Sequence, residues 1–235
     1  MKDLLARQKA FYEERYKAFG DDPRSLSYNS IESQRLRFRV LAELFRHEAG
    51  RGFSIHEAGC GLAHFNEFLQ TEGPSCTYSG SDIYEPFIEA SRAKFPDSAF
   101  VLQDMSVALD RIHPAARGSD YYVVSGTFNP INDCDPDQWE AFVFRVVNNM
   151  FALAGKGIAF NLLTTYVDYR DDQLYYADPR RFYDWCKTNL SRFVTVVSDY
   201  ALYEFSVLVY KPAFVRSLHT QEFERYFSSS DSDAE

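Results

Sequence analysis

The sequence lacks several features that would assign it to a class at once. Its four cysteines include no C-x-x-C pair, which argues against a zinc site or a disulfide scaffold and favours reduced thiols. No apolar run approaches the length of a membrane-spanning helix, and the first 19 residues are too charged for a secretory signal. These absences predict a cytoplasmic protein.

Positive charge is also scarce. The chain has 25 Lys and Arg against 34 Asp and Glu, a formal net charge of −9. The only local basic strip, Arg35, Arg37 and Arg39, is too short to form a nucleic-acid footprint. We therefore expect a small-molecule substrate, no nucleic-acid or membrane partner, and a monomer or homodimer.

Apolar and aromatic residues are abundant, and their spacing alternates between strand and helix periods. Hydrophobic residues make up 46% of the 235 residues, enough for the core of one domain. Strands are predicted at 53–58, 77–81, 100–102, 121–125, 157–163, 193–199 and 203–210. Helices are predicted at 2–19, 32–48, 63–71, 86–94, 106–116, 136–153 and 179–189. The alternation indicates an α/β fold with a parallel, helix-covered sheet, and the last two strands indicate an antiparallel hairpin at one edge.

The chain divides into three predicted parts. Residues 1–50 form an N-terminal helical cover of the active site, and residues 51–211 form the sheet domain. Residues 212–235 form a C-terminal extension, whose polar and acidic end, 228–235, is expected to be disordered.

A glycine-rich turn follows the first predicted strand, in the stretch HEAGCGLAH at 56–64. In an open parallel sheet, ligands bind beyond the carboxyl ends of the strands. Gly59 and Gly61 allow a ligand to approach the backbone, and the next helix contributes free N–H groups. The G-x-G-x-x-G pattern of nicotinamide dinucleotide sites is incomplete because His64 occupies the third position, which disfavours an oxidoreductase.

Carboxylates follow the next two strands. Asp82 ends the second strand, where a carboxylate suits the two hydroxyls of a ribose. Asp104 and Met105 follow the third strand and suit the amino group and ring face of adenine. Each residue alone is equally compatible with a tight turn or a helix cap, but their combination with the glycine turn favours a nucleoside ligand.

These stretches resemble an ordered set of family motifs. FSIHEAGCGLAHFNEFL, YSGSDIYEPFIEASRAKFP, FVLQDM and DYYVVSGTFN are similar to the motifs of class I S-adenosylmethionine-dependent methyltransferases, over about residues 53–211. The resemblance implies a Rossmann-like, doubly wound, seven-stranded sheet, mostly parallel with an antiparallel last strand, and S-adenosylmethionine as the cofactor.

The resemblance also assigns roles to residues. Glu57, Gly59 and Gly61 would hold the methionine end of the cofactor, Asp82 the ribose, and Asp104 with Met105 the adenine. The other predicted cofactor residues are Ile83, Ser125, Tyr28, Gln34 and Arg37. The methyltransferase motif differs from the dinucleotide pattern in having its third glycine two residues after Gly61. In this chain Ala63 replaces that glycine. The chain also departs from the family pattern at Asn129-Pro130-Ile131-Asn132, which is not the Asn-Pro-Pro-Tyr of enzymes that methylate nucleobases and protein glutamine.

The acceptor is expected above the fourth and fifth strands. Thr127 and Phe128 after the fourth strand, and Thr165 and Tyr169 in the long loop after the fifth, are the predicted substrate-binding residues. The candidate catalytic residues are His64, Asn129 and Tyr166. For each of them a packing or capping role is the alternative.

Two polar features have simpler explanations. His56 precedes Glu57 within the first strand and is expected to be a buried histidine with satisfied hydrogen bonds. The acidic cluster Asp133, Asp135 and Asp137 suggests a metal site, but Asp135-Pro136 fits a helix N-cap followed by proline at the first helical position. We therefore predict no metal.

The leading hypothesis is a methyltransferase acting on an oxygen or nitrogen atom of a small molecule. Sulfonium chemistry needs in-line positioning above all, so a catalytic base is optional. Two alternatives within the family stay open: a transferase using a modified, for example carboxylated, cofactor, and a non-catalytic cofactor-binding partner subunit.

Overall fold

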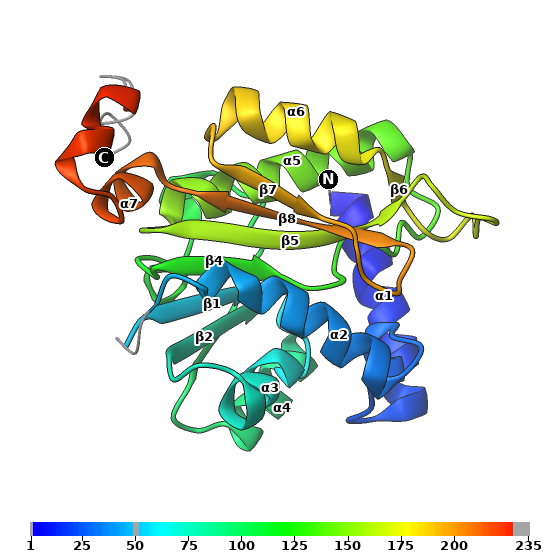
Figure 1. The fold of residues 1–235 in the computed structure, drawn as a ribbon. Helices are drawn as coiled ribbons and strands as arrows, with labels where there is room; N and C mark the ends of the chain where they lie inside the picture. The colour runs from blue at the N-terminus through cyan, green and yellow to red at the C-terminus, as the bar shows by residue number, and fades with distance from the viewer. Residues whose placement is uncertain (1, 49–51, 228–235) are drawn as a thin grey trace.

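The computed structural model describes residues 2–48 and 52–227 and contains one central sheet (Figure 1). Its main path has the order β3-β2-β1-β4-β5-β8-β7, and a short strand, β6, pairs with β5. The strands are β1 (Ser54–Ala58), β2 (Thr77–Asp82), β3 (Ala99–Leu102), β4 (Tyr121–Val124), β5 (Gly157–Thr164), β6 (Tyr176–Ala177), β7 (Val194–Val197) and β8 (Glu204–Tyr210).

The pairing confirms the predicted fold class. β1 to β5 run parallel to one another, whereas β8 is antiparallel to both β5 and β7. The predicted edge hairpin is therefore present, and the order reverses beside β1, as expected for a doubly wound sheet. The two-residue β6 brings the sheet to eight strands; it is too short to leave a periodic signal in the sequence.

Helices cover both faces of the sheet (Figure 1). α2 (Ile31–Ala42), α3 (His64–Glu72) and α4 (Glu85–Lys94) lie on one face, and α5 (Pro136–Leu153) and α6 (Pro179–Asn189) lie on the other. In β4, Tyr121 and Val123 belong to the core on the first of these faces, whereas Tyr122 and Val124 belong to the core on the second. This burial on both sides explains the uninterrupted apolar run YYVV.

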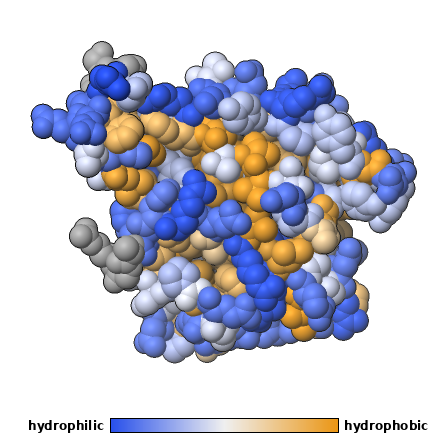
Figure 2. Space-filling model, viewed as in Figure 1, coloured by the Kyte–Doolittle hydropathy of each residue, from blue (hydrophilic) through white to orange (hydrophobic). Residues whose placement is uncertain are grey.

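The remaining elements lie at the ends of the chain and in its loops. α1 (Lys2–Phe19) crosses the carboxyl ends of the strands in Figure 1 and continues into the 3₁₀ turn η1 (Pro23–Leu26). The others are α7 (Pro212–Ser217) and the 3₁₀ turns η2 (Glu43–Phe45), η3 (Leu109–Arg111), η4 (Pro114–Ala116) and η5 (Gln221–Tyr226). Seen from the same side, Figure 2 shows polar residues over α2 and α6 and an apolar area between them.

Two predicted helices differ from the structure. The stretch 106–116 forms the turns η3 and η4 in place of an α-helix, because Pro114 disfavours a helical conformation of His113, whose ψ is 139°. The second helix ends at Ala42, and only the 3₁₀ turn η2 continues it.

Some predictions fall outside the described residues. They are the boundary near residue 50 and the disorder of 228–235. Within residues 2–48 and 52–227, none of the helices combines the length and apolar content of a membrane-spanning segment.

Candidate functional site

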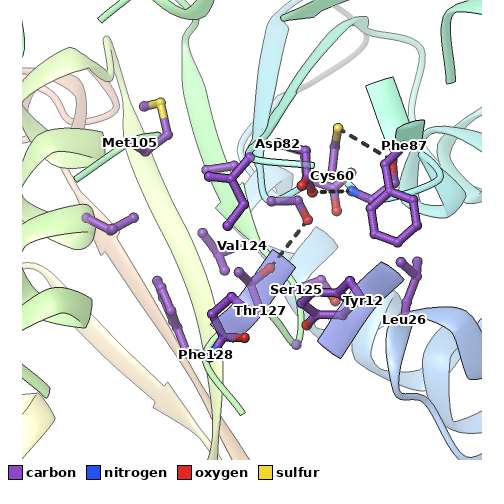
Figure 3. A pocket seen from close by; sticks show the side chains of 18 of the residues that line it. Tyr12, Leu26, Cys60, Asp82, Phe87, Met105, Val124, Ser125, Thr127 and Phe128 are labelled. Carbon is purple, nitrogen blue, oxygen red and sulfur yellow. Dashed lines mark hydrogen bonds between the residues drawn. The ribbon is translucent and has the colours of Figure 1, made fainter. Parts of the chain in front are cut away.

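A cavity lies at the carboxyl ends of β1 to β4, and Figure 3 shows side chains that line it. The space between its walls is about 900 Å³ when the open mouth is counted. Ten of the eleven predicted cofactor residues line it: Glu57, Gly59, Gly61, Asp82, Ile83, Asp104, Met105, Ser125, Tyr28 and Gln34. Sequence positions far apart therefore meet at one site.

The glycine turn forms the floor of the cavity. Gly59 and Gly61 have φ angles of 71° and 52°, in the left-handed region that favours glycine. A Cβ at Gly59 would lie 2.4 Å from Thr127 Oγ1, and one at Gly61 would lie 2.6 Å from Leu26 Cδ2. Both glycines are therefore required by backbone conformation and by the close approach of neighbouring side chains. Ala63 also adopts a left-handed conformation, with a φ of 56°.

Asp82 connects the end of β2 to the glycine turn. Its Oδ2 accepts a hydrogen bond from the backbone N–H of Gly61, and its Oδ1 accepts one from the N–H of Tyr84, both at 2.9 Å. Burial raises the pKa of Asp82, although these N–H groups oppose the shift. The carboxylate is thus fixed in the cavity wall and keeps lone pairs for a ligand.

Glu57 is a second buried acid in the cavity wall. It accepts a hydrogen bond from the Tyr78 hydroxyl. Burial, with a smaller contribution from the charge of Asp82, raises the pKa of Glu57 to about 8. Without a ligand, Glu57 is therefore mostly protonated at neutral pH, and a cationic ligand group beside it would favour its ionised form.

The third acidic position lies after β3. Asp104 Oδ1 accepts a hydrogen bond from the backbone N–H of Ser106 at 2.8 Å, and Met105 is buried in the cavity wall. The side chain of Asn149, on α5, donates to the Met105 carbonyl at 2.8 Å. This hydrogen bond holds the loop after β3 against α5. The loop thereby presents the apolar Met105 next to the Asp104 carboxylate.

The N-terminal helices were predicted to cover the active site, but no residue of α1 was selected as a site residue. Leu5, Gln8 and Tyr12 line the cavity from this helix, at a spacing that places them on one face. The ring of Tyr12 meets that of Phe87 edge-on at 5.9 Å, and Figure 3 shows both residues at the cavity. The helical period was visible in the sequence, but it did not show which residues of the helix would face the cavity.

The far wall was also missed. Trp139, Phe142 and Val146 of α5 line the cavity together with Phe128. The indole N–H of Trp139 donates to the Phe128 carbonyl at 3.0 Å. The amphipathic pattern of α5 predicted buried aromatics but not that they would border an opening in the core.

Of the candidate catalytic residues, only His64 lines the cavity. Its Nδ1 lies 3.1 Å from Gln34 Nε2, and its Nε2 lies 2.9 Å from Asp21 Oδ1. The Gln34 amide must donate to Nδ1, so Nε2 carries the proton and donates to Asp21. Both ring nitrogens are therefore engaged, which favours the packing alternative over a free base.

Five predicted site residues do not line the cavity. They are Arg37, Asn129, Thr165, Tyr166 and Tyr169. Tyr166 and Tyr169 are 64% and 72% exposed in the loop after β5. Arg37 and Asn129 are buried and bond to Glu204, a residue that the sequence analysis did not select.

Two of the simpler explanations are confirmed. The side chain of Asp135 accepts a hydrogen bond from the Gln138 N–H at 3.0 Å and caps α5. His56 is fully buried, and its ring nitrogens lie 2.8 Å and 2.9 Å from the hydroxyls of Ser79 and Ser81. Among the described residues, no group of three or more His, Cys, Asp or Glu is arranged to hold a metal ion.

Comparison with known proteins gives one relative by sequence and many by structure. No protein-family model matches the chain. A Mycobacterium tuberculosis protein named "Putative methyltransferase Rv1506c" is 35% identical over 162 residues, which cover 68% of this chain and 93% of that protein.

The structural neighbours share the fold at low sequence identity. Magnesium protoporphyrin IX methyltransferase from Synechocystis, crystallised with bound S-adenosylhomocysteine, gives a TM-score of 0.60 at 13% identity, over 89% of this chain and 98% of its own. Human N-acetylserotonin methyltransferase, in complex with S-adenosylmethionine, gives 0.55 at 14% identity, over 76% of this chain and 52% of its own.

Proposed function

Because this chain belongs to the class I S-adenosylmethionine-dependent methyltransferases, we propose that it methylates an oxygen or nitrogen atom of a small, uncharged acceptor. S-adenosylmethionine is the cofactor. The finer assignments of residues and acceptor rest on the geometry of the cavity.

The cavity residues suit the cofactor. Gly59 and Gly61 line the cavity without side chains, so a ligand can approach the backbone of the floor directly. We assign the methionine end of the cofactor to this floor and to Glu57, Ser125, Tyr28 and Gln34. We assign the ribose to Asp82 with Ile83 beside it, and the adenine to Asp104 and Met105. The observation that carries the assignment is the fixed Asp82 carboxylate directly above the glycine turn.

Methyl transfer needs little chemistry from the protein. The cofactor supplies an electrophilic methyl group, and the protein contributes binding, alignment and exclusion of water. Both ring nitrogens of His64 are occupied, so no free base among the candidate residues faces the cavity. A neutral amine nitrogen is nucleophilic without a base and releases its extra proton to solvent after the transfer, whereas a hydroxyl oxygen must release its proton to water as its bond to the methyl carbon forms.

The composition of the cavity wall supports an uncharged acceptor. Among the described residues that line the cavity, three are acids, Glu57, Asp82 and Asp104, and none is Lys or Arg. An anionic acceptor would be desolvated without a positive partner, which is unfavourable. The same argument disfavours a carboxylated form of the cofactor, whose extra negative charge would also need a partner.

The position of α1 supports a small acceptor. Leu5, Gln8 and Tyr12 of this helix lie over the strand ends. The helix is fastened to the loop after β4, because Gln8 Nε2 donates to the Pro130 carbonyl at 3.0 Å and Asn132 Nδ2 donates to Gln8 Oε1 at 2.9 Å. Because α1 covers the cavity in this way, a folded macromolecule cannot enter it, whereas a small molecule can.

A matched acceptor panel tests the proposal. The protein is incubated with S-adenosylmethionine and pairs of phenols or aromatic amines that differ only in a carboxylate, and S-adenosylhomocysteine is measured by mass spectrometry. We expect product with uncharged members and little with their anionic partners, and none from Asp82→Ala. Preferential turnover of the anionic members would contradict the proposed acceptor class.

A further inference from the structure

Glu204 is a buried carboxylate behind the wall of the cavity. It begins β8, is 2% exposed, and does not line the cavity. Its Oε1 and Oε2 both lie 2.8 Å from Arg37 Nε, and Oε1 accepts a further hydrogen bond from Arg37 Nη2 at 2.6 Å. Arg37 lies on α2, so this ion pair joins the N-terminal cover to the far part of the sheet.

Two asparagines extend the pair to the wall. Asn161 Nδ2 donates to Glu204 Oε2 at 2.9 Å, and Asn161 Oδ1 accepts from the backbone N–H of Gly126 at 2.8 Å. Asn129 Nδ2 donates to Glu204 Oε1 at 3.3 Å, and Asn129 Oδ1 accepts from the N–H of Leu163 at 3.1 Å. Both asparagines therefore use their two polar atoms to link Glu204 to the backbone.

The segment held in this way is the cavity wall after β4. Ser125, Gly126, Thr127 and Phe128 all line the cavity. Thr127 Oγ1 donates to the carbonyl of Gly59 at 3.3 Å, so the segment is also in contact with the glycine floor. Gly126 has a φ of 70°, an unusual turn that the hydrogen bond from its N–H to Asn161 stabilises.

The N-terminal cover adds a second connection to the same segment. The hydroxyl of Tyr28 donates to the Ser125 carbonyl at 3.0 Å, and the guanidinium of Arg37 lies 5.1 Å from the centre of the Tyr28 ring. Arg37 therefore contacts both Glu204 and the aromatic ring that supports the wall.

The ion pair is poorly explained by stability alone. A buried ion pair is often no more stabilising than apolar residues of similar volume. Arg37 Nη1 is buried and has no hydrogen-bond partner among the described residues, which adds a desolvation penalty. Burial disfavours the charged form of Arg37 and lowers its pKa. The carboxylate of Glu204 stabilises the charged form more strongly, so the pKa of Arg37 is raised. The polar network is explained better by a role in fixing the cavity wall after β4 than by stability alone.

We propose that Glu204 is a positioning residue: through Arg37, Asn161 and Asn129 it holds the 125–129 wall at the distance from the glycine turn that the cofactor requires. The inference rests on the proposed function, because that function assigns the methionine end of the cofactor to this wall. In this proposal Arg37 and Asn129 help to position the wall and do not contact the ligand themselves.

Glu204→Gln tests this role, with Glu48→Gln as the matched control. The substitution keeps the size of the side chain and removes its charge. Glu48 is also a largely buried acid in an ion pair, with Lys156 at 2.8 Å, and it accepts from the Tyr121 hydroxyl at 2.7 Å. It lies beside the first residues of β4 and β5, at the opposite end of the sheet from the cavity.

Three measurements are made on each protein: the melting temperature, the Kd for S-adenosylhomocysteine, and amide hydrogen exchange at Gly126 and Leu163. We expect both variants to melt at lower temperature. Only Glu204→Gln should exchange faster at the two amides and bind S-adenosylhomocysteine about tenfold more weakly, a typical effect of one lost charge-assisted hydrogen bond. Asn161→Leu breaks the connection to Gly126 but leaves the Arg37 pair and the Asn129 contact with Leu163. It should exchange faster at Gly126 only and bind S-adenosylhomocysteine more weakly, and it replaces Glu204→Gln if that protein does not fold.

Wild-type affinity in a folded Glu204→Gln protein would overturn the positioning role, whatever its amide exchange. Equal weakening by Glu48→Gln would also overturn it, since the effect would then be one of general stability. If the wild type itself does not bind S-adenosylhomocysteine, the proposed function fails, and exchange at Gly126 still decides whether Glu204 holds the wall.

Discussion

The Asp82 carboxylate and the Gly61 backbone N–H form a 2.9 Å hydrogen bond across 21 residues of sequence. This contact joins the end of β2 to the glycine turn after β1. The carboxylate is thereby fixed before any ligand arrives, so a ligand that uses it need not order it. The contact is therefore the structural centre of the proposed cofactor site.

Removing the charge of Asp82 should weaken cofactor binding without unfolding the protein. Asn retains one carbonyl oxygen as an acceptor, but it lacks the charge that strengthens hydrogen bonds from two hydroxyls. We expect Asp82→Asn to raise the Kd for S-adenosylhomocysteine by about 10- to 100-fold in a calorimetric titration. Asp97→Asn, at an exposed site, makes the same change of net charge and should leave the Kd unaltered.

Substitution of the floor glycine should abolish binding. Gly59→Ala combines a left-handed φ of 71° with a clash at Thr127, and we expect a destabilisation of about 1–3 kcal/mol together with loss of binding. Gly118→Ala is the control, because Gly118 has a φ of 79° but nothing within 4 Å of its added Cβ. It should lose similar stability and keep its affinity in the same titration. If Gly118→Ala also lost affinity, backbone strain alone would explain the result.

Ionisation of Glu57 should make stability depend on pH. Its pKa is raised from 4.5 to about 8 in the folded protein, so the folded state retains a proton that the unfolded chain has released. The contribution is fully present below pH 4.5 and is lost as pH rises toward 8. The melting temperature of the wild type, relative to Glu57→Gln, should therefore fall between about pH 5.5 and pH 8.5. A pH-independent difference between the two ligand-free proteins would contradict this account.

Tyr12, which lines the cavity from α1, should slow ligand release. Tyr12→Ala opens the cavity beneath α1, and we expect S-adenosylhomocysteine to dissociate about tenfold faster in a stopped-flow displacement experiment. Tyr16→Ala is the matched control, because Tyr16 also meets the Phe87 ring, at 5.3 Å, but does not line the cavity. Similar acceleration by both variants would assign the effect to loosening of the helix as a whole.

The sequence predicted the sheet and the glycine turn because both depend on local signals. Gly59 and Gly61 adopt left-handed φ angles that favour glycine, and Asp82 is the last residue of β2. The acceptor side was predicted less well. The exposed Tyr166 and Tyr169 suggested a functional loop, yet the structure places them away from the cavity.

The missed residues depend on contacts between distant parts of the chain. Tyr12 belongs to a helix whose amphipathic pattern does not reveal what its apolar face covers. Glu204 pairs with Arg37 across 167 residues, and no spacing rule connects two such positions. Arg37 was selected for its charge, but its partner became visible only once β8 was placed beside β5.

The most direct test of the account is a crystal structure of the protein with S-adenosylhomocysteine. We predict the ribose hydroxyls about 3 Å from the Asp82 carboxylate, the amino-acid end over Gly59 and Gly61, and Tyr12 above the ligand. S-adenosylhomocysteine bound outside this cavity, or inside it with the ribose turned away from Asp82, would contradict the central claim.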